Sequence, residues 1–129
     1  LIDALARDNV YIMVDTLHAG RAGVTAEELA RTNPKYFNFI HLCDGPAGPD
    51  GDPVLDNIKD DLMLFTAREY RLYTGDGVMD IAGMVKALPN IPLSIELPNL
   101  ENISKYGVAG HARNCIEKAK AYFKANGIE

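Results

Sequence analysis

The sequence is poor in several patterns that mark common classes of protein. It has two cysteines in 129 residues, too few for a disulfide framework or for a site built from thiolates. We therefore expect Cys43 and Cys115 to be reduced packing residues, which favours the cytoplasm as the location. The formal net charge is -5, and the lysines and arginines form no cluster. A nucleic-acid partner is not expected, because binding a phosphate backbone requires concentrated positive charge.

Long apolar runs are also absent. No run approaches the roughly 20 residues that a membrane-spanning helix needs, and no basic segment followed by an apolar one opens the chain. We therefore expect no membrane partner. The apolar share of 47% suits a single packed core over residues 1–129, which is within the usual size of one domain. The chain opens at Leu1 without a methionine, and we expect it to be a piece of a longer protein.

The sequence does contain strands and helices in alternation. Three continuous apolar runs predict strands, at 10–15, 36–43 and 91–98. Between and around them, four segments predict helices: LIDALARDN, TAEELARTNP with Thr25 as N-cap and Glu28 as its capping-box partner, IAGMVKALP, and GHARNCIEKAKAYFKANG. The stretch VLDNIKDDLMLFTAREYRLY predicts a short helix inside a long loop. Apolar strands separated by helices are typical of an α/β fold with a parallel sheet that is buried on both faces.

Polar side chains lie at the carboxyl ends of these predicted strands. Asp15 ends the first strand, His41 and Asp44 end the second, and Glu96 lies near the end of the third. In parallel α/β folds these ends meet at one edge, where active sites form. Each residue alone also has a simpler interpretation: Asp15 as a cap of the following turn, and His41 as a core histidine.

Glu96 is the hardest of these residues to explain as packing. It stands between LSI and LP in an apolar strand, where an unpaired carboxylate would cost several kcal/mol. We therefore expect a cation beside it. Carboxylates and an imidazole without a thiolate suit a divalent metal ion such as Mn²⁺, Mg²⁺, Co²⁺ or Zn²⁺.

Four ordered segments carry a resemblance to a known family. MVDTLHAGRAGVTAEEL, FIHLCDGPAGP, YRLYTGDGVMDIAGMVKALPNIPLSIELP and HARNCIEKAKAYF resemble the C-terminal half of the sugar phosphate isomerase/epimerase family. The resemblance implies a xylose isomerase-like TIM barrel, here a partial barrel with strands six to eight and their helices. The family includes ketose 3-epimerases, inosose dehydratases and the endonuclease IV group. The endonuclease branch is not expected here, because its members need more histidines and a basic groove.

The resemblance implies a metal site and a set of substrate contacts. The metal ligands would be Asp15, His41 and Glu96, together with a glutamate from the fifth strand, which would precede this sequence. Substrate contacts would come from His18, Arg21 and Arg71; the other interpretation of the two arginines is a solvated loop side chain. Asp44 would orient the ring of His41 through its second nitrogen.

The resemblance also implies a reaction. The expected function is a metal-dependent isomerase or epimerase of a small sugar or polyol, with Glu96 both as ligand and as the base that removes a proton beside a metal-chelated carbonyl, giving an enediolate. One alternative is a lyase of the same fold, such as a keto-inositol dehydratase. Another is a non-catalytic half-barrel that acts in assembly. Open sheet edges seek a partner, so we expect a homo-oligomer or a complementing N-terminal half-barrel.

Overall fold

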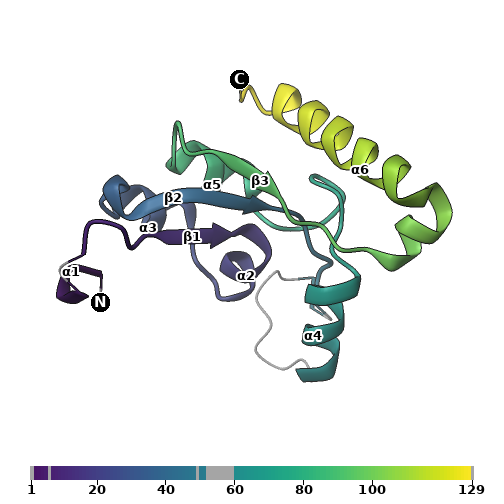
Figure 1. Cartoon of the computed structure of the whole chain (residues 1–129), viewed down its shortest axis with the longest axis horizontal. Coiled ribbons are helices and arrows are strands. Elements are labelled where there is room, and N and C mark those ends of the chain that lie inside the picture. Colours follow the sequence, from purple (N-terminus) through teal and green to yellow (C-terminus); the bar gives the residue numbers. More distant parts are fainter. Residues whose placement is uncertain (1, 6, 49, 52–59, 129) are drawn as a thin grey trace.

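The fold is a small parallel sheet with helices around it (Figure 1). The computed structural model describes residues 2–5, 7–48, 50–51 and 60–128. The strands are β1 (Ile12–Asp15), β2 (Phe37–Leu42) and β3 (Leu93–Ile95), in the order β1-β2-β3. Both pairings are parallel, as the sequence predicts.

The helices follow the predicted alternation, with two differences. They are α1 (Ile2–Leu5), α2 (Thr16–Arg21), α3 (Ala26–Arg31), η1 (Pro34–Tyr36), α4 (Asp60–Glu69), α5 (Ile81–Ala87) and α6 (Leu100–Ala125). Neither α2 nor η1 was predicted from the sequence, and the last helix was predicted to begin at Gly110 instead of Leu100. That helix contains Gly107, whose φ of 69° and ψ of 166° are not helical. The predicted loop over 52–59 lies outside the described residues.

The start of helix α3 was predicted correctly from its capping residues. Thr25 caps α3: its hydroxyl accepts a hydrogen bond from the Glu28 N–H at 3.2 Å, and the Glu28 carboxylate accepts one from the Thr25 N–H at 2.9 Å. This reciprocal pair is the capping box expected from the sequence. It fixes the start of α3, which then packs against α5.

The core gathers around the central strand. Ile40 and Leu42 of β2 are fully buried, and so are Leu17 of α2 and Ile81 and Met84 of α5. Burial alternates over the second part of β2, where Phe39 and His41 are partly covered and Ile40 and Leu42 are buried. One face of the sheet therefore packs on the core, and the other carries side chains that remain accessible.

The edge strands differ from the prediction of strands buried on both faces. Ile12 and Met13 of β1 are 39% and 41% exposed, and Leu93 and Ile95 of β3 are 38% and 37% exposed. The reason is that each of these strands has a single neighbour within the described part of the chain.

Within the described residues, no helix combines the length and the apolar character that crossing a membrane would require.

Candidate metal centre

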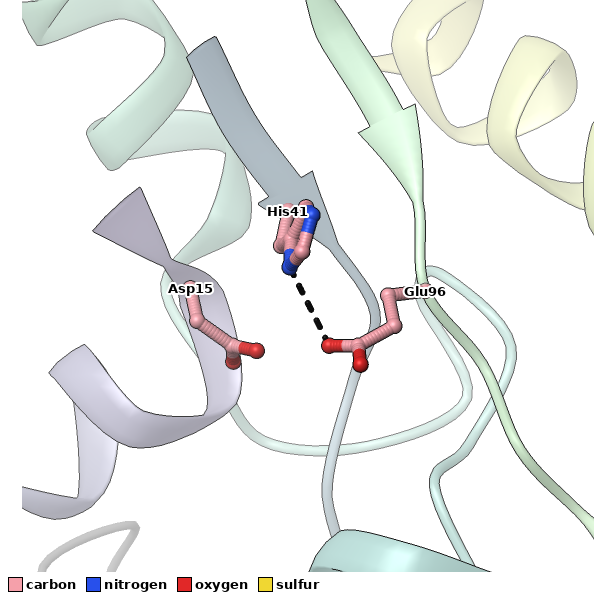
Figure 2. A group of neighbouring side chains, drawn as sticks. All are labelled: Asp15, His41 and Glu96. Atoms are coloured by element: carbon pink, nitrogen blue, oxygen red, sulfur yellow. Dashed lines mark ion pairs between the residues drawn. The ribbon is translucent and has the colours of Figure 1, made fainter. Parts of the chain in front are cut away.

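Asp15, His41 and Glu96 lie together at the carboxyl ends of the three strands (Figure 2). Each offers one ligand atom, and these atoms all lie within 4.8 Å of one another. Strand register explains the meeting, because Asp15 pairs with His41, and His41 pairs with Ser94. Glu96 follows Ser94 by two residues, which places both side chains on the same face of the sheet.

Asp15 is buried and has two structural partners. One carboxylate oxygen, Oδ1, accepts hydrogen bonds from the N–H groups of Leu17 at 3.0 Å and His18 at 3.2 Å, so Asp15 is the N-cap of α2. The other, Oδ2, accepts a hydrogen bond from Arg71 at 2.6 Å. Burial would raise the pKa of Asp15, but the hydrogen bonds from Arg71 and His18 outweigh it and hold the pKa below its ordinary value. Asp15 is therefore ionised at neutral pH.

The imidazole of His41 points at Glu96. Its Nδ1 atom lies 3.2 Å from Oε2 of Glu96, within ion-pair range. Nevertheless Nδ1 is buried and has no hydrogen-bond partner, so the contact is close but poorly aligned for a hydrogen bond. The ring of Phe39 lies against His41, with the ring centroids 5.1 Å apart. A buried nitrogen without a hydrogen bond is available as a metal ligand.

Arg71 supplies a positive charge to the cluster. Its Nη1 atom lies 2.6 Å from Oδ2 of Asp15 and 3.0 Å from Oε2 of Glu96. The Nε–H donates to the carbonyl of Ala67 at 2.8 Å, which fixes the side chain from behind. A guanidinium therefore lies beside Glu96, in addition to the divalent cation that the sequence leads us to expect there.

The donor set at this edge fits a divalent cation. Two carboxylates and one imidazole are ligands for Zn²⁺, Mn²⁺, Co²⁺ or Mg²⁺, and the buried Nδ1 of His41 has no other partner. Glu96 is the accessible member, since its side chain is 45% exposed. A metal bound by these three residues would share their negative charge with the guanidinium of Arg71.

The other predicted residues occupy different positions. His18 is exposed on α2, one turn after Asp15. Arg21 and Arg71 are 8% and 4% exposed, which contradicts the alternative interpretation of both as solvated loop side chains. Arg71 contacts the carboxylates of the cluster, whereas Arg21 lies at the end of α2.

Asp44 has a structural position that the sequence analysis did not anticipate. Its carboxylate accepts hydrogen bonds from the N–H groups of Gly45 at 2.9 Å and of Gly75, Gly77 and Met79 at 3.0 Å. No hydrogen bond joins Asp44 to His41 in the part of the chain that the structure describes. Asp44 therefore holds the loop 75–79 against the end of β2, because its oxygens are engaged by backbone groups.

Two further residues lie beside the cluster: Thr16 was not singled out from the sequence, and Cys43 was expected only as a packing residue. The Thr16 hydroxyl donates to the carbonyl of Cys43 at 2.5 Å and accepts from the N–H of Cys43 at 3.1 Å, which joins the ends of β1 and β2. The Cys43 thiol lies 3.2 Å from Nη1 of Arg71. Burial raises the pKa of this thiol, so it stays protonated at neutral pH. The position of Thr16 directly after Asp15 was the available signal.

Comparisons with known proteins give the fold. The sequence matches no protein-family model, and no curated protein matches it. A solved structure described as the IolI protein with a bound zinc atom is 23% identical over 95% of this chain, with a TM-score of 0.72. A xylose isomerase domain protein from Alicyclobacillus acidocaldarius subsp. acidocaldarius is 19% identical over 92% of this chain, with a TM-score of 0.60.

The two structures are longer than this chain, which covers 41% of the first and 38% of the second. At these identities the likeness concerns the fold alone. The chain has the fold of part of a xylose isomerase-like TIM barrel, as the resemblance predicted.

Proposed function

We propose that this chain carries part of the active site of a metal-dependent isomerase or epimerase that acts on a sugar or polyol. The observation that supports the proposal is the convergence of Asp15, His41 and Glu96 within 4.8 Å. A protein with a similar fold is described with a bound zinc atom, and another as a xylose isomerase domain protein. The first description supports the metal in the proposal, and the second supports the sugar isomerase class.

The residues of the cluster would have different tasks. A divalent ion held there would act as a Lewis acid toward a carbonyl and its neighbouring hydroxyl, making the adjacent C–H more acidic. Asp15 contributes an oxygen that is ionised at neutral pH, because Arg71 and two backbone N–H groups stabilise its charge. Glu96 is the group that takes the proton from carbon, because its half-exposed carboxylate can reach a ligand. His18, exposed beside Asp15, would contact the substrate.

We also propose that residues 1–129 are the C-terminal half of one barrel domain. The chain covers about two-fifths of the two solved structures, and the apolar side chains of β1 and β3 are partly exposed. A complementing half-barrel would cover them and would supply the further carboxylate that the family resemblance implies. The purely structural alternative predicts the same exposed edges but no metal binding.

Calorimetric titration with Zn²⁺ and then Mn²⁺ tests the metal site. We expect the chain to bind one ion, and the variants Glu96→Gln and His41→Ala to lose it. Glu117 is an exposed glutamate on α6, and Glu117→Gln is the matched control that should bind as the unaltered chain does. Binding that survives in both site variants, or no binding by a folded chain, would contradict the proposal.

The reaction is tested on ketoses and keto-polyols in deuterated water. An isomerase or epimerase exchanges the hydrogen next to the carbonyl, which proton NMR detects as loss of that signal. A dehydratase would instead form a conjugated enone that absorbs in the ultraviolet. Enone formation without exchanged substrate would favour the lyase over the isomerase.

A further inference from the structure

Arg21 is a buried cation that the metal cluster does not use. It is the last residue of α2 and is 8% exposed. Its Nε–H has no hydrogen-bond partner. Among the residues that the structure describes, no aspartate or glutamate forms an ion pair with it. This distinguishes Arg21 from Arg71, which is neutralised by Asp15 and Glu96.

Arg21 lines a pocket of about 180 Å³. That volume is several times the share of roughly 30 Å³ that one water molecule takes in the liquid. The walls come from the loop after β2, with Pro46 and Ala47, and from α4 and its end, with Phe65 and Tyr70. Phe65 and Tyr70 are stacked, with the ring centroids 5.9 Å apart. The guanidinium is therefore the charged group of a pocket with mainly apolar walls.

Among the described residues, no carboxylate compensates the charge of Arg21 by an ion pair. Burial lowers the pKa of Arg21 and outweighs Cys43, which acts in the opposite direction, and the neighbouring Arg71 lowers this pKa further. The Cys43 thiol nearby is protonated at neutral pH, because burial raises its pKa. A buried charge is costly unless it is paired. A guanidinium presents its N–H groups as a fork that matches an oxyanion, so an anion that entered the pocket would supply the partner that the described residues lack.

We propose that Arg21 binds a carboxylate on the substrate, so that the substrate is a polyhydroxy acid. A single guanidinium balances the single charge of a carboxylate, whereas a phosphate dianion would bring a second charge into walls formed by Pro46, Ala47 and Phe65. Arg21 follows Asp15 by six residues along α2, which is roughly 9 Å of helix axis. Arg71 contacts the cluster and is also close enough to Arg21 to affect its pKa, so a sugar acid with its carbonyl end at the cluster would extend its carboxylate toward Arg21. The substrate class rests on the proposed function, but the anion site does not.

Anion binding is measured without metal, in the presence of a chelator and at constant ionic strength. The probes are gluconate, the uncharged polyol sorbitol and inorganic phosphate. Calorimetry measures the binding of each probe, and thermal unfolding measures its effect on the midpoint temperature of the chain. We expect gluconate to bind and to raise the midpoint, and sorbitol to do neither. In Arg21→Gln, gluconate binding should weaken at least about tenfold, as expected for the loss of a charged hydrogen-bonding group. Arg21→Lys should retain part of it.

Arg113, an exposed arginine on α6, provides the control Arg113→Gln, which should bind gluconate normally. Equal effects of gluconate and sorbitol, or gluconate binding that persists in Arg21→Gln, would overturn the anion site. Tighter binding of phosphate than of gluconate would overturn the carboxylate assignment. The metal titration of the same variants separates the two proposals, because Arg21→Gln should bind Zn²⁺ as the unaltered chain does. Gluconate binding without Zn²⁺ binding would contradict the proposed function and leave the anion site at Arg21 supported.

Discussion

The guanidinium of Arg71 donates to the carboxylate of Asp15 at 2.6 Å, and both side chains are almost completely buried. The same Nη1 atom lies 3.0 Å from Glu96. Arg71 thus holds the two carboxylates of the cluster close to each other. Its guanidinium also occupies space beside them. Both the stability of the chain and its affinity for a metal ion depend on this pair.

Replacing Arg71 by methionine should destabilise the metal-free chain by about 3–5 kcal/mol, because a buried carboxylate loses its partner. Urea denaturation measures the change. Added Zn²⁺ should stabilise Arg71→Met more than the unaltered chain, because the ion then replaces a missing charge. This expectation assumes that the guanidinium and the metal ion compete for the carboxylates of Asp15 and Glu96. Equal stabilisation of both chains by Zn²⁺ would contradict that competition.

The stability of the chain should depend on acid through Asp15. Its pKa is depressed in the folded state below the ordinary value of 3.8, so its contribution is present above pH 3.8 and lost as the pH falls through the lower folded value. Urea denaturation between neutral and acid pH should show a gap between the unaltered chain and Asp15→Asn that closes on acidification. Asp76, in a surface ion pair with Lys118, gives the control Asp76→Asn with a much smaller gap.

Asp44→Ala should lower the free energy of unfolding by at least about 2 kcal/mol, because four backbone N–H groups lose a charged acceptor. The folded fraction should still bind metal with unchanged affinity, since Asp44 makes no hydrogen bond to His41 in the described residues. Calorimetry under conditions where the variant is folded tests this. Weaker metal binding with full stability would instead support the orienting role expected from the sequence.

Gly77→Ala should cost about 1–3 kcal/mol by overpacking. A Cβ at this position would overlap the carbonyl oxygen of Gly45 and the carboxylate of Asp44. Gly127 has a φ of +64° but open space around it, so Gly127→Ala reports backbone strain without a clash and should cost less. Thermal unfolding of the two variants compares these effects, and an equal loss in both would argue against the tight approach at Gly77.

The sequence was most informative where the structure follows local or periodic rules. Thr25 and Glu28 are three residues apart and form their capping box as predicted. The meeting of Asp15, His41 and Glu96 follows from the alignment of parallel strand ends. We predicted their proximity from that rule, a divalent metal from the chemistry of the three donors, and the ligand set from the family resemblance; the metal role itself stays a prediction.

The remaining features depend on contacts between distant residues. The bond from Arg71 to Asp15 spans 56 positions, and nothing near Arg71 in the sequence specifies its partner. Asp15 was interpreted as a ligand at a strand end or as a cap of the following turn; the structure confirms the cap, but a helix after that turn was not predicted. At Gly107 the backbone leaves helical geometry, which interrupts the apolar pattern and explains why the start of α6 at Leu100 was missed.

The pairing of β3 with β2 has a consequence for how this chain reaches its native state. Glu96 faces His41 only because Ser94 is opposite His41; a slip by one residue would present Ile95 or Leu97 there instead. The three side chains of the cluster therefore come together only in the native register of β3 on β2. A metal ion that needs all three donors would bind only the correctly aligned sheet and would stabilise it over the slipped one. Metal binding would therefore also select the native strand register.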